Sequence, residues 1–113
     1  MNIYDKAYEL ARAIQEGEEA QSFNQVLSEA AADPAAKRLL DRFRERQTAL
    51  QQQIMAGEEP EEAELASMNR LYEELDAHPL IHRVFEAERR LAVIYDDVNR
   101  ILANTLRAIT GSV

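Results

Sequence analysis

Two histidines are the residues of this sequence that most resemble metal ligands. His78 and His82 lie four residues apart, a spacing that puts two imidazoles on one face of a helix and could begin a metal site. His78 precedes Pro79, however, and a residue before proline is biased away from helical geometry. Neither histidine has the glutamate three residues before it that a di-metal carboxylate site needs. We therefore expect a helix cap and a surface histidine, and no metal ligand.

Paired carboxylates could supply acid and base catalysis, but only from a pocket that perturbs them. The serines lack a glycine-rich elbow, and three scattered glycines cannot form a phosphate-binding loop. The absence of cysteine excludes thiolate zinc sites, cysteine nucleophiles and cysteine-ligated iron–sulfur clusters within this sequence. We predict no catalytic residue, no cofactor and no metal. The acidic pairs lie at expected helix starts or on polar faces: Glu18-Glu19, Glu58-Glu59, Glu61-Glu62 and Glu73-Glu74.

Arginines spaced four apart form the most prominent basic feature. Arg38, Arg42 and Arg46 would make a ridge along one helix, able to contact phosphates or an acidic partner. Asp41 and Glu45 interrupt the ridge, and no aromatic residues alternate with the arginines as in proteins that bind single strands. We expect these arginines to pair with acidic helices of the same oligomer. The alternative is an RNA- or anion-binding adaptor that uses the ridge.

The elements that position these residues are predicted to be helices. Only three glycines and three prolines occur in 113 residues, and helix formers dominate. Asn2 can cap one helix, Asp33 followed by Pro34 another, and Gly57 can end that one in the left-handed conformation. The expected fold is all-α, a single five-helix, bundle-like domain over residues 1–113. Its helices are predicted at roughly 2–16, 18–32, 34–56, 60–77 and 79–110.

The last of these helices carries an apolar stripe too wide for one neighbour. Two overlapping heptad series share Val84, Leu91 and Val98. At about 1.5 Å per residue, ~32 residues span roughly 48 Å, whereas a domain of this size has a radius of gyration of about 13 Å. The helix should therefore extend past its own domain and pack against a second chain. The predicted oligomer interface consists of Leu91, Ile94, Tyr95, Val98 and Leu102.

Charge and hydropathy limit the partners. The formal net charge is −8, and such a field repels nucleic acid and anionic lipid. No run of about 18 apolar residues occurs, and the first residues lack the features of a signal peptide. We expect a cytoplasmic protein that contacts neither membrane nor nucleic acid. It should form a homo-oligomer, a dimer or a tetramer, with paralogous or regulatory proteins as further candidate partners.

The order and spacing of these segments resemble those of the YlbF/YmcA family of small bacterial helical proteins, and within it the YheA-like branch. No single segment is specific, but together they cover almost the whole sequence. The matching segments are Tyr4–Leu10, Asp33–Leu40 with Phe43, Met55–Glu58, His78–Ile81, and Glu86–Glu88 followed by Val98–Leu102.

The resemblance implies an all-helical, cytoplasmic, oligomeric protein. Some members of the family are non-catalytic regulators of competence, sporulation and biofilm development, within a complex that modulates RNase Y-dependent mRNA processing. Those members carry cysteines for an iron–sulfur cluster, and because this sequence has no cysteine the cluster does not carry over. We expect a non-enzymatic helical module for oligomerisation and protein interaction, with a regulatory role of the YlbF/YmcA type.

Replacing Leu91 and Val98 by aspartate should break the predicted interface, because charged carboxylates are costly to bury in an apolar contact. We expect the mass measured by light scattering to shift towards that of a monomer or an unfolded chain. A fully folded variant with an unchanged oligomeric mass would contradict the predicted interface.

Overall fold

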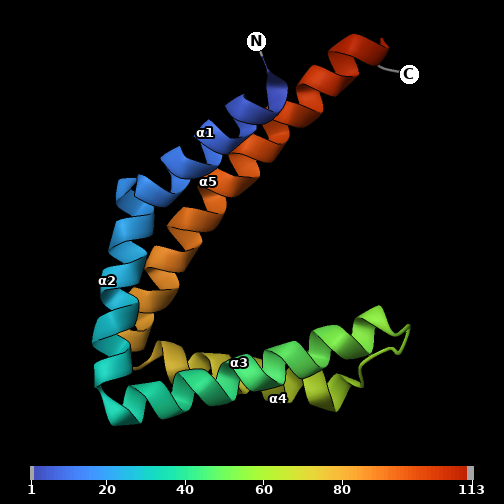
Figure 1. The fold of residues 1–113 in the computed structure, drawn as a ribbon. Helices are drawn as coiled ribbons and strands as arrows, with labels where there is room; N and C mark the ends of the chain where they lie inside the picture. The colour runs from blue at the N-terminus through green and yellow to red at the C-terminus, as the bar shows by residue number, and fades with distance from the viewer. Residues whose placement is uncertain (1, 112–113) are drawn as a thin grey trace. The chain divides into compact units, whose positions relative to one another are not determined.

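The computed structural model describes residues 2–111 and contains five α helices, with no strand among those residues (Figure 1). The predicted all-α class and the predicted number of helices are confirmed. No helix in the described part of the chain is both long enough and apolar enough to cross a membrane. The helices are α1 (Ile3–Glu16), α2 (Glu18–Ala32), α3 (Pro34–Met55), α4 (Glu62–Asp76) and α5 (Pro79–Thr110).

The helices belong to two compact units, and the boundaries between the units fall inside α2 and α5. The terminal unit comprises the chain up to residue 24 and the chain from residue 86 onward, so it contains α1 and most of α5. The central unit comprises residues 25–85 and contains α3, α4, the C-terminal half of α2 and the first turns of α5.

Side-chain caps start α1 and α3 at the residues that the sequence predicted. Asp33 Oδ1 accepts hydrogen bonds from the backbone N–H groups of Ala35 at 3.0 Å and Ala36 at 3.2 Å. Asn2 caps α1 in the same way. Pro34 lies in the first turn of α3, where its missing N–H is harmless. These caps satisfy N–H groups that a helix start otherwise leaves without a partner.

Gly57 ends α3 in the left-handed conformation, as predicted, with a φ of 83°. Its N–H donates to the carbonyl of Ile54, and the N–H of Glu58 donates to the carbonyl of Gln53, both at 3.0 Å. This pair of hydrogen bonds is the Schellman motif, which satisfies the last carbonyls of a helix. The chain therefore turns sharply after α3 and can return as α4.

The start of α4 differs from the prediction. The sequence places a helix start at Pro60, whereas α4 begins at Glu62. The reason is the backbone of Glu61, which is extended with φ −71° and ψ 150°. Its carbonyl accepts the first helical hydrogen bond, from the N–H of Leu65 at 3.1 Å. Pro60 therefore belongs to the loop, in which its ring restricts the backbone φ angle without starting the helix.

Three aromatic rings hold the central unit together. Phe43 of α3 has its ring centroid 5.6 Å from that of Phe85 of α5 and 6.1 Å from that of Tyr72 of α4. The rings of Tyr72 and Phe85 stack at 5.1 Å. α3 and α4 pack against each other and run antiparallel (Figure 1), so they form a helical hairpin. The apolar side chains that are fully buried in this unit include Leu75, Ile81 and Val84.

The terminal unit buries much less. Its buried apolar residues within the described part of the chain are Ala20 and Ala87, both of which are small. α1 contains no buried residue. The larger apolar side chains of this unit are therefore half-buried or exposed.

Replacing Asp33 by alanine should lower the free energy of unfolding by about 1 kcal/mol, because two N–H groups at the start of α3 lose their acceptor. Thermal denaturation followed by circular dichroism measures this as a midpoint about 4–8 °C lower. The matched control is Asp33→Asn, which keeps an oxygen acceptor and should retain most of the stability. An alanine variant as stable as the native chain would contradict the capping role.

Candidate interaction surfaces

α5 carries an apolar stripe that remains largely exposed. Four of its side chains are exposed, from Leu102 at 58% to Ile109 at 76%, while Leu91 and Val98 are half-buried. Large contiguous apolar patches on a protein surface mark interaction sites. We call this set of residues the α5 stripe. Its members succeed each other at intervals of three or four residues and so share one side of the helix: Leu91, Tyr95, Val98, Leu102, Leu106 and Ile109.

The opposite side of α5 is polar and forms ion pairs within the helix. Arg100 Nη2 donates to Asp97 Oδ1 at 2.7 Å, and Arg89 pairs with Glu86 at the same spacing of three residues. Such pairs on one helix face stabilise the helix slightly and remain in water. α5 is therefore amphipathic, and its polar side is exposed to solvent.

α1 adds exposed apolar side chains to the same unit. Ile3 is 79% exposed, and Tyr4, Tyr8 and Leu10 are exposed as well. Ile3 and Leu10 are seven residues apart and therefore lie on one side of the helix. The terminal unit thus presents uncovered apolar residues from both of its longest helical segments.

The residues predicted as the oligomer interface are not equivalent in the structure. Tyr95 and Leu102 are exposed, whereas Leu91, Ile94 and Val98 are half-buried. An aspartate at a half-buried position can therefore disturb the chain itself as well as an interface. The predicted set ends at Leu102, whereas the exposed apolar residues of α5 continue to Leu106 and Ile109. The seven-residue spacing from Leu102 to Ile109 is the signal that could have found the second of these.

The arginine ridge divides into two environments. Arg46 Nη2 donates to Ser67 Oγ at 2.8 Å and so links α3 to α4. Arg38 and Arg42 are exposed, and neither takes part in an ion pair found among residues 2–111. Of the three predicted polyanion contacts, two therefore point a free charge towards water and one supports the hairpin.

The lysine beside this ridge is held by its own helix. Lys37 Nζ lies 2.9 Å from Asp41 Oδ2, one helical turn away. The hydrogen bond to Asp41, together with the attraction of its charge, raises the pKa of the Lys37 ammonium. Because this lysine already has a local partner, the free positive charge of the ridge resides on the arginines.

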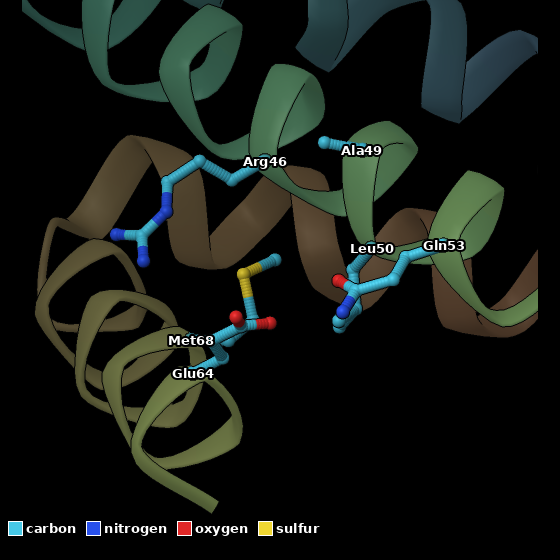
Figure 2. A pocket seen from close by; sticks show the side chains of 6 residues that line it. All are labelled: Arg46, Ala49, Leu50, Gln53, Glu64 and Met68. Atoms are coloured by element: carbon cyan, nitrogen blue, oxygen red, sulfur yellow. The ribbon is translucent and has the colours of Figure 1, made fainter. Parts of the chain in front are cut away.

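An open groove lies between α3 and α4. Figure 2 shows Arg46 at one side of it, Leu50 and Gln53 at the other, and the Met68 side chain between them. Its volume is about 190 Å³, which is below the ~300 Å³ at which small-molecule pockets begin. A groove of this size suits one or two side chains of another protein. We call it the hairpin groove; it is lined by Arg46, Ala49, Leu50, Gln53, Glu64 and Met68.

The two histidines have different surroundings. His82 Nδ1 lies 2.9 Å from Asp76 Oδ1, so this ring is engaged by a carboxylate. The Nδ1 of His78 is buried without a hydrogen-bond partner in the described part of the chain. No three histidine or carboxylate side chains come together as a metal-binding group among residues 2–111.

A sequence model of one protein family matches residues 3–107, and its description is "Control of competence regulator ComK, YlbF/YmcA". A UPF0342 protein of Alkalihalophilus pseudofirmus is 40% identical over 111 residues, which covers 98% of this chain and 94% of that protein. The UPF0342 protein YheA of Bacillus subtilis is 34% identical over 113 residues, which covers all of this chain and 97% of that one.

Solved structures match over nearly the whole chain. The structure of yheA from Bacillus subtilis superposes with a TM-score of 0.74 at 25% identity and covers 96% of this chain and 99% of its own. A protein of unknown function (DUF964) from Bacillus stearothermophilus has a TM-score of 0.87 at 19% identity, with coverage of 97% and 96%. Helical proteins of one fold therefore match almost every residue of this chain.

Proposed function

This chain belongs to the YlbF/YmcA family, and we propose that it is a non-enzymatic helical module that associates with a second copy of itself through the α5 stripe. The observation that carries the proposal is the exposure of the stripe in a helix whose other side is polar. Removing such apolar side chains from water is the main favourable term in most protein association. At roughly 1.5–3 kcal/mol for each large apolar side chain fully buried, the exposed members could supply a stable contact.

The spacing of the stripe favours another helix as the occupant. Leu91, Tyr95, Val98 and Leu102 alternate at four, three and four residues, which is the pattern by which two helices pack along a shared seam. Ile109 continues it one heptad after Leu102. A two-fold contact lets the same seam serve both partners, and dimers of this kind are the commonest oligomers. The α5 helix of a second copy of this chain is therefore the partner that fits the seam.

Three of the polar side chains that could react have structural partners, which supports a non-enzymatic role. Ser67 accepts the hydrogen bond of Arg46, and His82 is engaged by Asp76. Asp33 caps α3. A catalytic group needs to be free to exchange protons or attack a substrate, whereas these three groups already take part in structural hydrogen bonds.

The role that follows is regulatory. The family description refers to control of the competence regulator ComK, and a protein that acts by association can exert control by occupying a partner's surface. We place the protein in the cytoplasm, with paralogous or regulatory proteins as additional partners. The arginine ridge is not assigned to RNA, because Arg46 is bound to Ser67 and no aromatic residues alternate with the arginines along the sequence.

Replacing Leu102 by aspartate should weaken self-association, because the side chain is exposed in the single chain and its charge would enter the contact. The cost of burying an unpaired polar group is at least ~2 kcal/mol, which corresponds to about a thirtyfold larger Kd. Mass measured by light scattering over a dilution series reports the change, and circular dichroism reports that helix content is kept.

The matched control is Asn104→Asp, which adds the same charge to the polar side of the same helix. We expect it to keep the native mass at every concentration. If Leu102→Asp and Asn104→Asp behave alike, the α5 stripe is not the interface.

A further inference from the structure

Two neighbouring arginines of α3 carry charges that the fold leaves unpaired. Arg38 and Arg42 are exposed, and neither belongs to an ion pair found among residues 2–111. The acidic residue between them in the sequence, Asp41, is already bound by Lys37 at 2.9 Å. A guanidinium group presents its N–H donors in a planar fork that matches a carboxylate. Two such groups one helical turn apart therefore attract carboxylates locally, even in a chain of net charge −8.

The two arginines lie on the same side of α3 as the hairpin groove. Four residues follow each other at intervals of four, seven and four and so share this side of the helix: Arg38, Arg42, Ala49 and Gln53. The last two line the groove, in which Leu50 and the Met68 side chain of α4 supply apolar surface (Figure 2). We call the four residues, together with the groove, the arginine–groove surface.

Ala49 makes the middle of this surface easy to approach. It is exposed, and its side chain ends at Cβ. Besides the groove, it borders a second open hollow of about 370 Å³, which is also lined by Thr48 and Gln52. A short side chain between two hollows lets another helix come close, since packed helices have axes about 8–10 Å apart. The surface therefore has room for a helix laid along α3.

Two glutamates limit what this surface can bind. Glu45 lies three residues after Arg42 on α3, and Glu64 lines the groove from α4. A ligand with evenly spaced negative charges, such as the phosphates of a nucleic acid, would meet these carboxylates beyond the arginines and be repelled. An occupant whose negative charge is confined to one end avoids that repulsion. The charges therefore favour a protein segment over a nucleic acid.

The spacing on α3 defines the pattern that such a segment needs. Arg38 and Arg42 are four residues apart, about 6 Å along the helix, and Ala49 lies seven residues, about 10.5 Å, beyond Arg42. A helix laid along α3 has the same rise per residue, so its side chains can match these intervals. Amphipathic helices dock in grooves through anchors at such spacings. The matching pattern is two carboxylates four residues apart and one long apolar side chain seven residues from the nearer carboxylate.

We propose that the arginine–groove surface docks an amphipathic helix of another protein, which carries this pattern of two carboxylates and one apolar side chain. The carboxylates pair with Arg38 and Arg42, and the apolar side chain enters the groove between Leu50 and Met68. This contact is separate from the proposed self-association, because every residue of the surface belongs to the central unit and none to the α5 stripe. The chain thus has one surface for a copy of itself and another for a different protein.

A synthetic helix tests the surface directly. The probe is an alanine- and glutamine-rich peptide of about 20 residues, long enough to form an isolated helix, with two glutamates four residues apart and a leucine seven residues beyond the second. A second probe has the reverse order, because both directions along α3 satisfy the spacing. In a titration of the nitrogen-15-labelled protein with one of the two probes, we expect the amide signals of Arg38, Arg42, Ala49 and Gln53 to shift, while those of the α5 stripe stay in place.

The arginine end is tested by Arg38→Gln with Arg42→Gln. We expect the Kd of the peptide to rise about two- to thirtyfold, because two exposed ion pairs are lost. The matched control is Arg12→Gln with Arg70→Gln, which changes the net charge equally at exposed positions outside the surface and should keep the native Kd. Salt should reduce the difference between the variant and the native chain, since the Debye length falls from about 10 Å at 0.1 M to about 3 Å at 1 M salt.

The groove end is tested by Ala49→Glu, which places a carboxylate at the edge of the groove and against the acidic peptide. We expect a Kd at least about tenfold larger. The matched control is Ala66→Glu, at an exposed position of α4 outside the groove, which should bind as the native chain does. Moving the leucine of the peptide by two residues turns it about 200° around the helix and should weaken binding by a similar factor, because the groove is then left empty.

Four results would overturn the proposal: no amide shift with either peptide, shifts that lie outside the arginine–groove surface, a Kd unchanged by the two arginine substitutions, or equal binding of the peptide with the displaced leucine. Poly(U) that displaces the peptide and no longer binds the arginine variant would assign the surface to a polyanion instead. A lower mass of Ala49→Glu in light scattering, with Ala66→Glu unchanged, would assign it to a second copy of the chain. Leu102→Asp should leave peptide binding intact, so the outcome for the α5 stripe is read separately.

Discussion

The contact among Phe43, Tyr72 and Phe85 is the interaction on which the central unit depends. It joins three helices whose residues are separated by up to 42 positions in the sequence. Aromatic pairs in offset or tilted arrangements contribute about 0.5–1.5 kcal/mol each beyond the burial of their area. Buried aliphatic residues of the same unit, among them Leu75 and Ile81, add to this core. The tight packing of this protein is therefore concentrated where α3, α4 and the first turns of α5 meet.

That concentration determines which apolar residues remain uncovered. Past the aromatic contact, the hairpin is held by the hydrogen bond between Arg46 and Ser67 and by half-buried side chains such as Leu50 and Met68. The terminal unit buries only small residues such as Ala20 and Ala87 within the described part of the chain. Both regions consequently keep apolar surface that folding of the single chain does not remove from water, and association is the remaining way to remove it.

The features that the sequence predicted well are those decided by neighbouring residues. Asp33 and Pro34 start α3, and Gly57 ends it. Each acts on residues only a few positions away in the sequence, so its effect on α3 follows from local chemistry. The observed start of α4 lies two residues after the predicted one, because several carboxylates and Pro60 offered similar starts, and the extended backbone of Glu61 makes Glu62 the first helical residue.

The surfaces were harder to predict, since periodicity shows which side of a helix is apolar but not what covers it. Leu91 and Leu102 belong to one seam in the sequence, yet one is half-buried and the other exposed. The link from Arg46 to Ser67 joins residues 21 positions apart, and no local pattern indicates it. The hairpin groove depends on that link and on the turn at Gly57, so it required the tertiary structure.

α1 has a consequence for the dynamics of the chain. A helix of 14 residues with no buried side chain is close to the length at which isolated helices are marginal in water. Its stability comes from the cap at Asn2 and from pairs such as Lys6 with Glu9, each a small contribution. Its amide hydrogens should therefore exchange with solvent through local opening long before those of α3, whose residues Leu40 and Phe43 are buried. The order of the N-terminal helix is thus readily changed by whatever binds next to it.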